Sequence, residues 1–324
     1  MSLPTFSFTT TAEEVADVLS AEIKGKNVLI TGTSLNGIGF EAARVIGKHA
    51  NLVVITGYSD ERLKLSEDAI KKDSPSANIR RLTLDLSSFA AVRKAAAEVN
   101  AYLEPLHVLI NNAASAGGPF KLTVDKLETQ METGHLGPFL FTKLLVPKLL
   151  AAGTESYVPR VVFVSSAAHA IGTGPNLVTV AHPDAASYTL FETYTQVKSA
   201  NILTARELAR RSDGRINAYS LHPGTIYTNI MQKEESIANL KGTGLLTLDG
   251  KPSTERIPDW KTIPQGAATT VAAAFDPRLN DKSGAYLDDS TEANHKLAPH
   301  IREPGSAEKL WAVSEEVIGE EFAF

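Results

Sequence analysis

Short runs of β-branched and aliphatic residues alternate with longer amphipathic stretches from Lys26 onward, and this rhythm constrains the fold more than any other feature of the chain. Such alternation is typical of β-α-β units around a parallel sheet. Strands are predicted at 27–31, 52–56, 79–84, 107–111, 160–165, 216–221 and 284–287. Helices are predicted at 40–49, 61–72, 89–103, 121–150, 188–211 and 265–274.

The strands are apolar almost throughout, as in Val161-Val162-Phe163-Val164, which favours a sheet covered by helices on both faces. We therefore predict an α/β fold with a doubly wound, Rossmann-type parallel sheet. No Pro/Gly/Ser-rich linker interrupts residues 26–324, so we expect a single domain. Residues 1–25 are expected to form an N-terminal arm packed on the outside. Residues 225–263, a long irregular insertion after a strand end, are expected to form a substrate lid.

The composition excludes several classes of protein. The 324 residues are 43% hydrophobic and include no cysteine, so the chain can bury a core without disulfides. The formal charge of −5 argues against nucleic-acid binding and favours small-molecule partners. No apolar run approaches the ~18 residues of a membrane span, and the first residues do not resemble a signal peptide, which predicts a cytoplasmic location. None of the 8 histidines has metal-ligand spacing, so no metal site is predicted.

A glycine-rich turn, Thr31-Gly32-Thr33-Ser34-Leu35-Asn36-Gly37-Ile38-Gly39, lies between the first predicted strand and a helix. Glycines allow close approach to a pyrophosphate, and the free N–H groups of the following helix favour an anion. A tight turn without a ligand is the plainer alternative. A serine hydrolase elbow around Ser34 is disfavoured, because Asn36 stands where that motif needs glycine.

Tyr194 is the one tyrosine among 8 that has a lysine four places further on, Lys198. Residues i and i+4 share one face of a helix, so both can meet one reactant. An ammonium near a phenol favours the phenolate, so we expect Lys198 to bring the pKa of Tyr194 down from ~10 towards neutral pH. A surface neighbour pair without chemistry is the alternative.

Two further signals accompany these: Asp85 ends a predicted strand, and Asn111-Asn112-Ala113-Ala114 ends the next. Taken in order, the four signals resemble the short-chain dehydrogenase/reductase family, from about Lys26 to at least Thr228. Lys198-Ser199-Ala200-Asn201-Ile202-Leu203 and His222-Pro223-Gly224 resemble its retinol-dehydrogenase-like branch most closely. The resemblance implies an oxidoreductase that transfers a hydride between a nicotinamide dinucleotide and a carbonyl or alcohol. It leaves both a homodimer and a monomer open.

The resemblance also implies catalytic roles. Tyr194 would exchange a proton with the substrate oxygen, Lys198 would hold the nicotinamide ribose, and Ser166 would orient the substrate oxygen, with Ser165 a structural neighbour. Gly134 stands where the family has an asparagine. Glycine keeps the main-chain carbonyl, which in the family binds a water of the proton relay. It lacks the asparagine side chain, which in the family braces a helix kink, so we expect a working but slower proton relay. The alternative function is a catalytically impaired dinucleotide-binding sensor or interaction module.

The cofactor contacts implied by the resemblance fall into three groups. The phosphates would meet Gly32, Thr33, Ser34, Asn36, Gly37, Ile38 and Gly39. The adenosine would meet Tyr58, Asp85, Leu86, Asn112 and Ala113, although Asp85 has an alternative role as a helix cap. The nicotinamide side would meet Tyr194, Lys198, Pro223, Gly224, Ile226 and Thr228. The chain departs from the family at Ala113, a glycine there, and by having four rather than three residues between Gly32 and Gly37.

The end of the second strand favours NADP(H) over NAD(H), because Gly57 replaces the carboxylate that would bind the ribose of NAD. Tyr58 stands where an arginine is usual, so a phosphate would rely on Thr33, Ser34, Ser59 and Arg62. We interpret Asp60 as an acidic residue at the start of a helix, where a negative charge interacts favourably with the helix dipole. The insertion contributes an apolar set that suggests a hydrophobic ketone, aldehyde or alcohol as substrate, although packing explains the same residues: Tyr227, Ile230, Met231, Leu240, Leu245, Leu246 and Trp260.

Overall fold

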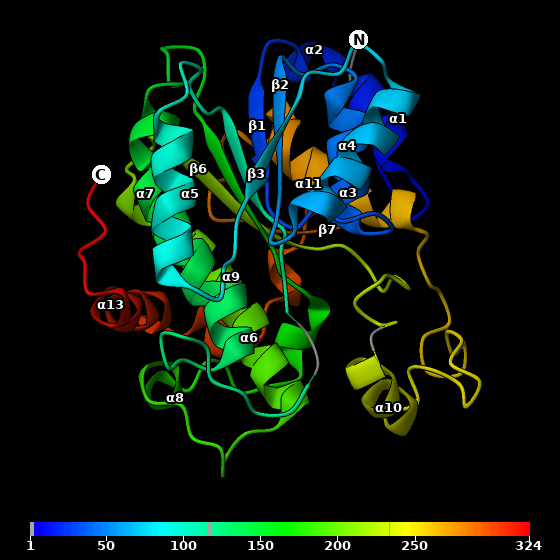
Figure 1. The fold of residues 1–324 in the computed structure, drawn as a ribbon, viewed down its shortest axis with the longest axis vertical. Helices are drawn as coiled ribbons and strands as arrows, with labels where there is room; N and C mark the ends of the chain where they lie inside the picture. Colours follow the sequence, from blue (N-terminus) through cyan, green and yellow to red (C-terminus); the bar gives the residue numbers. More distant parts are fainter. Residues whose placement is uncertain (1–2, 116–117, 233) are drawn as a thin grey trace.

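The computed structural model describes residues 3–115, 118–232 and 234–324 and is built on one eight-stranded sheet (Figure 1). The strand order is β3-β2-β1-β4-β5-β6-β7-β8, parallel up to β7, with β8 antiparallel to β7. The strands are β1 Asn27–Ile30, β2 Leu52–Gly57, β3 Ile79–Thr83, β4 Val108–Asn111, β5 Arg160–Val164, β6 Asn217–His222, β7 Tyr286–Asp288 and β8 Thr291–Glu292. The predicted doubly wound α/β fold is confirmed.

Helices cover both faces of the sheet (Figure 1). One face carries α3 (Ile38–Gly47), α4 (Asp60–Asp73) and α11 (Ile263–Phe275), and the other carries α5 (Phe89–Asn100), α7 (Gly137–Leu150) and α9 (Leu190–Arg211). Successive side chains of a strand point to opposite faces, so β1 supplies Val28 and Ile30 to one apolar cluster and Leu29 to the other.

The remaining helices are α1 Ala12–Val18, α2 Ser20–Ile23, α6 Thr129–Met131, α8 Leu177–Ala181, α10 Glu234–Gly242, α12 Pro299–Arg302, α13 Ser306–Ile318, a π-helix at Glu132–Leu136 and 3₁₀ turns at Ala167–Ala170, Pro277–Leu279 and Asn294–Lys296. Several of them were missed by the sequence interpretation, among them α8, α10, α12 and α13. The missed α13 packs on α9, with Trp311 fully buried against Phe139 of α7. The insertion is not wholly irregular, because it contains α10.

The predicted continuous helix over 121–150 is wrong in its first part. Lys126 has a φ of +62°, and Leu122 and Glu128 form an isolated antiparallel bridge, so residues 121–128 form a loop. The helix starts at Thr129 because the Glu128 carboxylate accepts hydrogen bonds from the backbone N–H groups of Gln130 (3.0 Å) and Met131 (2.8 Å).

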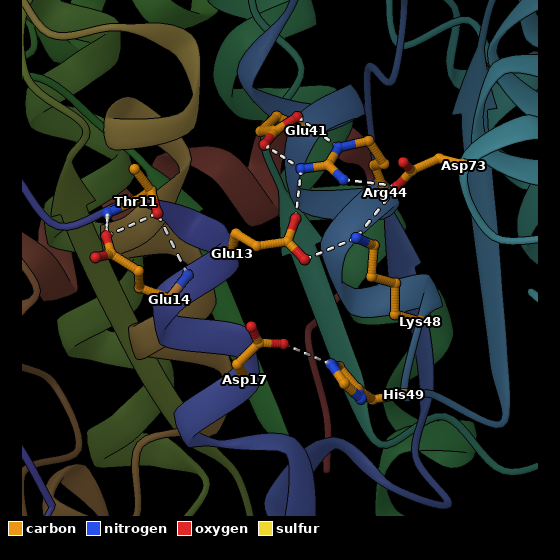
Figure 2. A network of polar contacts seen from close by, with 9 residues as sticks. All are labelled: Thr11, Glu13, Glu14, Asp17, Glu41, Arg44, Lys48, His49 and Asp73. Carbon is orange, nitrogen blue, oxygen red and sulfur yellow. Dashed lines mark hydrogen bonds and ion pairs between the residues drawn. The ribbon is translucent and has the colours of Figure 1, made fainter.

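The N-terminal segment forms an outer layer over α3 and α11. Its α1 buries Val15 in the apolar cluster on that face. Figure 2 shows the ion pairs around it: Arg44 of α3 pairs with Glu13 of α1 (2.7 Å) and with Asp73 of α4 (2.7 Å), while Lys48 also pairs with Glu13 (2.7 Å). A network of several charges stabilises more than isolated surface pairs do, so the segment is held by both packing and charge.

Among residues 3–115, 118–232 and 234–324, no helix combines the length and the apolar character that crossing a bilayer would need.

Candidate active site

The strand order reverses at β1, which has β2 on one side and β4 on the other, and in open α/β sheets ligands bind outside the strand ends at such a switch point. The turn after β1 is fixed by the end of β4. The Thr31 hydroxyl accepts from the backbone N–H groups of Asn112 (3.0 Å) and Ala113 (2.9 Å). The Asn112 amide donates to the carbonyls of Thr31 (2.8 Å) and Gly32 (2.9 Å). Asn112 is therefore a brace for the turn, a role that the sequence did not indicate.

Two glycines of this turn have no room for a side chain. Gly32 has a φ of +71°, and a Cβ there would lie 2.8 Å from the Cα of Ala113. A Cβ at Gly39 would lie 2.3 Å from the Asn112 amide nitrogen and 2.6 Å from the carbonyl oxygen of Gly32. Both positions need glycine because the turn itself is closely packed.

The first turn of α3, at this end of the sheet, has no side-chain cap for its backbone N–H groups. Its N-cap is Gly37, which offers no side-chain acceptor, whereas Ser59, Ser88 and Thr189 cap α4, α5 and α9 with their side chains. Uncapped N–H groups at a helix start, together with the helix dipole, favour an anion. The residues present therefore fit the pyrophosphate of a dinucleotide.

At the end of β2, the hydroxyl of Thr33, a predicted phosphate contact, is fully buried and donates to the carbonyl of Thr56 (3.2 Å). Arg62 and Tyr58 instead form an exposed pair, with Arg62 Nη1 donating to the phenol oxygen (2.9 Å). Asp60 is bound by Arg81, whose Nη1 lies 2.9 Å from both carboxylate oxygens.

Asp85 closes a turn after β3. One oxygen of its carboxylate accepts from the backbone N–H (2.9 Å) and the hydroxyl (2.6 Å) of Ser87. This contact closes the turn before α5 and is not the helix cap considered as an alternative, because Ser88 is the N-cap of α5; Asp85 remains exposed. Its neighbour Leu86 is buried. Ser34 is half-buried beside Leu35, and Asn36 is exposed with a φ of +58°.

Tyr194 and Lys198 lie on the same side of α9, with Lys198 Nζ 5.5 Å from the centre of the Tyr194 ring. Lys198 is buried, and its ammonium donates to the carbonyl of Val164 (3.0 Å). Burial lowers the pKa of Lys198 to about 8. The expected lowering of the Tyr194 pKa is wrong: burial raises it, and the hydrogen bond with the Ser166 hydroxyl opposes that rise.

The two serines after β5 have different partners. Ser165 is buried and donates to the carbonyl of Lys198 (2.6 Å), which fixes the backbone of α9 at the lysine. Ser166 is half-buried, and its hydroxyl also accepts from the N–H of Ala168 (3.2 Å). Two histidines hold this turn: His169 Nδ1 lies 2.7 Å from the carbonyl of Ser166, and His222 Nδ1 accepts from the N–H of Ala167 (3.1 Å). No sequence motif pointed to His169.

Gly134 lies in the π-helix and packs against α9. A Cβ there would lie 2.5 Å from Cγ1 of Val197, directly before Lys198. We expected the loss of an asparagine brace; in the structure Val197 fills that space. The next residue, His135, is buried and lies 2.9 Å from the Ser314 hydroxyl of α13, so the C-terminal helix holds the π-helix. π-helical turns often mark functional sites.

Glu132 begins the same π-helix and is fully buried. Burial raises its pKa to about 8, and nearby Asp125 and Asp85 act in the same direction. Thr123 donates a hydrogen bond to one oxygen of the carboxyl group. A protonated carboxyl group is thus built into the helix that carries Gly134.

The segment after β6 is joined to the end of the insertion. Gly224 has a φ of +94°, and a Cβ there would lie 2.6 Å from Cδ of Lys261. Ile226 pairs with Lys261 in a parallel bridge, Pro223 is buried and Thr228 is half-buried. Several predicted pocket-wall residues pack inside the insertion: the Tyr227 hydroxyl donates to Gly250 (3.0 Å), Trp260 donates to Ser253 (3.0 Å), and Leu246 is buried.

Residues 26–238 match the family model described as short chain dehydrogenase. The chain belongs to the short-chain dehydrogenase family. Its relatives include the chloroplastic short-chain dehydrogenase TIC 32 A of Brassica napus, 35% identical over 95% of this chain and 92% of the relative. Human retinol dehydrogenase 12 is 32% identical over 93% and 88% of the two chains, which places this dehydrogenase in the retinol-dehydrogenase-like branch.

Solved structures agree with this short-chain dehydrogenase fold. An uncharacterised protein from Mycobacterium Paratuberculosis is 26% identical, with a TM-score of 0.69 over 94% of this chain and 98% of that chain. The Pseudomonas aeruginosa RhlG/NADP active-site complex is 20% identical, with a TM-score of 0.60 over 82% and 94%. As a family member, the chain is an NAD(P)-dependent oxidoreductase that acts on alcohol or carbonyl groups.

Proposed function

We propose that this dehydrogenase interconverts a hydrophobic carbonyl compound and its alcohol with NADP(H), using Tyr194 as the general acid and base. The observation that carries the proposal is the grouping of Tyr194, its hydrogen-bond partner Ser166 and Lys198 at the edge of the sheet where β1 to β6 end. That edge also holds the glycine turn and the uncapped start of α3.

The nicotinamide, when bound, supplies or accepts the hydride. The backbone of the turn from Gly32 to Gly39 would hold the phosphates. Lys198 would bind the ribose hydroxyls, and the segment Pro223–Thr228 would bind the carboxamide. The exposed Arg62, which donates to Tyr58 after the end of β2, would bind the additional phosphate of NADP. The solved fold relative in complex with NADP is consistent with this choice.

The proton chemistry follows from the state of the phenol. Because burial raises the pKa of Tyr194, the hydroxyl keeps its proton at neutral pH, which is the form that carbonyl reduction needs. Ser166 orients the substrate oxygen towards this proton. The ammonium of Lys198 then stabilises the phenolate as the proton leaves. The reverse sequence serves alcohol oxidation.

The direct test is to mix the purified protein with NADPH and a panel of apolar ketones and aldehydes, or NADP with alcohols, and follow the absorbance of the reduced cofactor. Tyr194→Phe should lower kcat at least about 100-fold, since it removes the acid and base. Tyr102→Phe, which removes a distant phenol on the α5 side, is the matched control and should retain full turnover. Undiminished turnover by Tyr194→Phe would refute the assignment.

A catalytically impaired sensor is a second candidate, because Gly134 replaces the relay asparagine and the phenol is not acidified. It predicts tight NADPH binding with no turnover on any member of the panel.

The cofactor preference has its own test. Arg62→Ala should raise KM for NADPH about 5-fold and leave KM for NADH unchanged, because it removes one charge-assisted contact to phosphate. Lys64→Ala removes a neighbouring cation of α4 that pairs with Asp68 and should change neither value. Equal effects of Arg62→Ala on both cofactors would contradict the preference for NADP(H).

The cytoplasmic location and the assembly state remain predictions. The names of the TIC 32 relatives describe chloroplastic proteins.

A further inference from the structure

We propose that Asn229 latches the insertion onto the phosphate-binding turn, so that the dinucleotide enters and leaves when this contact opens. The inference rests on the proposed function. The observation behind it is one hydrogen bond, in which the side-chain amide of Asn229 donates to the carbonyl oxygen of Leu35. These residues lie 194 positions apart in the chain, so the contact joins two separate parts of the site.

The acceptor lies in the part of the turn that departs from the family pattern. Four residues, Thr33 to Asn36, separate Gly32 from Gly37, and Asn36 has a φ of +58°. Thr33 is tied down by Thr56, so the additional length is accommodated in the segment that includes Leu35 and exposed Asn36. The longer turn presents a backbone acceptor to the insertion next to the start of α3.

The donor lies in a segment anchored at its base. The N–H of Lys261, near the end of the insertion, donates to the carbonyl of Thr225 (2.9 Å), and its buried ammonium pairs with Asp289 (2.5 Å). Beyond this base the insertion is held by its own contacts, such as Tyr227 to Gly250. Figure 1 shows α10 and the surrounding loops set apart from the helical layers, below α3 and α4 in the view. Such a segment can move about its base.

The position of Asn229 connects the two ends of the cofactor site. It directly follows Thr228, the predicted nicotinamide contact, and it touches the turn predicted to bind the phosphates. A dinucleotide bound to both segments would therefore lie beneath a closed latch. One hydrogen bond contributes too little to decide whether the protein folds, but enough to change the rate of release.

The test is the release of NADPH from the full chain, measured by stopped-flow fluorescence. Asn229→Ala should accelerate release about 3- to 10-fold, the expected effect of one hydrogen bond, without lowering Tm of the cofactor-free protein. Asn229→Asp loses the donor and places a carboxylate against a carbonyl, so release should be at least as fast. Asn239→Ala, which changes a half-buried asparagine of α10, is the matched control and should behave as wild type.

The latch would be overturned if Asn229→Ala released NADPH at the wild-type rate, or if Asn239→Ala accelerated NADPH release equally. Either result would leave the proposed function intact. A wild-type protein that binds no NADPH would overturn both. If Asn229→Ala lowers Tm, then Asn229→Ser replaces it, since serine keeps a short polar side chain that cannot reach as far.

Discussion

Two regions of the candidate active site use glycine for a close approach, but their neighbours differ. In the turn after β1, a side chain at Gly32 would meet the backbone of Ala113, and one at Gly39 would meet Asn112 and the carbonyl of Gly32. In the π-helix, a side chain at Gly134 would meet Cγ1 of Val197 within 3 Å and nothing else so closely. The first region cannot yield without moving strands, whereas the second can be relieved by trimming one side chain.

The polar contacts show the same difference. The turn after β1 is tied to β4 through Thr31 and Asn112, both at strand ends in the centre of the sheet. The π-helix is tied to α13 by His135 and Ser314, two buried side chains that meet between helices. We therefore expect the nucleotide side to tolerate almost no change and the catalytic side to be adjustable.

The largest effect should come from Gly39→Ala. The added methyl overlaps a backbone carbonyl and the bracing amide, so NADPH affinity should fall at least about 100-fold and Tm should drop by several degrees. Isothermal titration and thermal unfolding measure both. Gly242→Ala in α10, where nothing lies within 4 Å, is the control and should keep wild-type affinity. Normal NADPH binding by Gly39→Ala would break the comparison.

Gly134→Ala should have a smaller effect, because Val197 must shift to admit the methyl. We expect a loss of about 1–3 kcal/mol in stability and a lower kcat. Adding Val197→Ala to Gly134→Ala should restore much of the stability and of kcat. A double-mutant cycle should therefore show strong coupling between positions 134 and 197. Additive losses would show that the strain lies in the π-helical backbone instead of in this contact.

Glu132 allows the π-helix to be probed by pH. Its pKa is raised from 4.5 to about 8, so the folded state holds a proton that the unfolded state releases above pH 4.5. Its contribution to stability is complete below pH 4.5 and is lost as the pH rises through about 8, at about 1.4 kcal/mol per unit within this window. Tm should therefore fall between about pH 5 and 8, and Glu132→Gln should flatten that fall. An identical pH profile for the variant would contradict the buried, protonated carboxyl group.

The smallest effect should come from Ala113→Gly, which restores the residue usual in the family. The turn is positioned by Thr31 and Asn112, and the methyl of the partly buried Ala113 packs against the apolar cluster beside β4. We expect NADPH affinity to change less than about 3-fold. A larger gain would mean that this methyl, and not the bracing contacts, limits cofactor binding.

Much of the fold could be predicted because hydrophobic periodicity reports burial directly. The seven predicted strands all appear, since a two-faced sheet requires apolar runs such as Val161 to Val164. The start of the helix at Thr129 was missed because it depends on a side-chain cap and a positive φ at Lys126, which periodicity does not report. The C-terminal α13 was missed although its buried residues, Leu310, Trp311, Ser314 and Ile318, have the spacing of one helix face, so this element could have been predicted.

The sequence by itself determined the family, the order of the motifs and the shared helix face of Tyr194 and Lys198, because these depend on local spacing. Only the tertiary structure decided how each residue is used. It turned Thr33 and Asn112 into braces, raised the pKa of Tyr194, filled the place of a missing asparagine with Val197, and brought Asn229 to Leu35. Hydrogen-bond partners and pKa values depend on burial and on contacts between distant segments, and local sequence does not determine either of them.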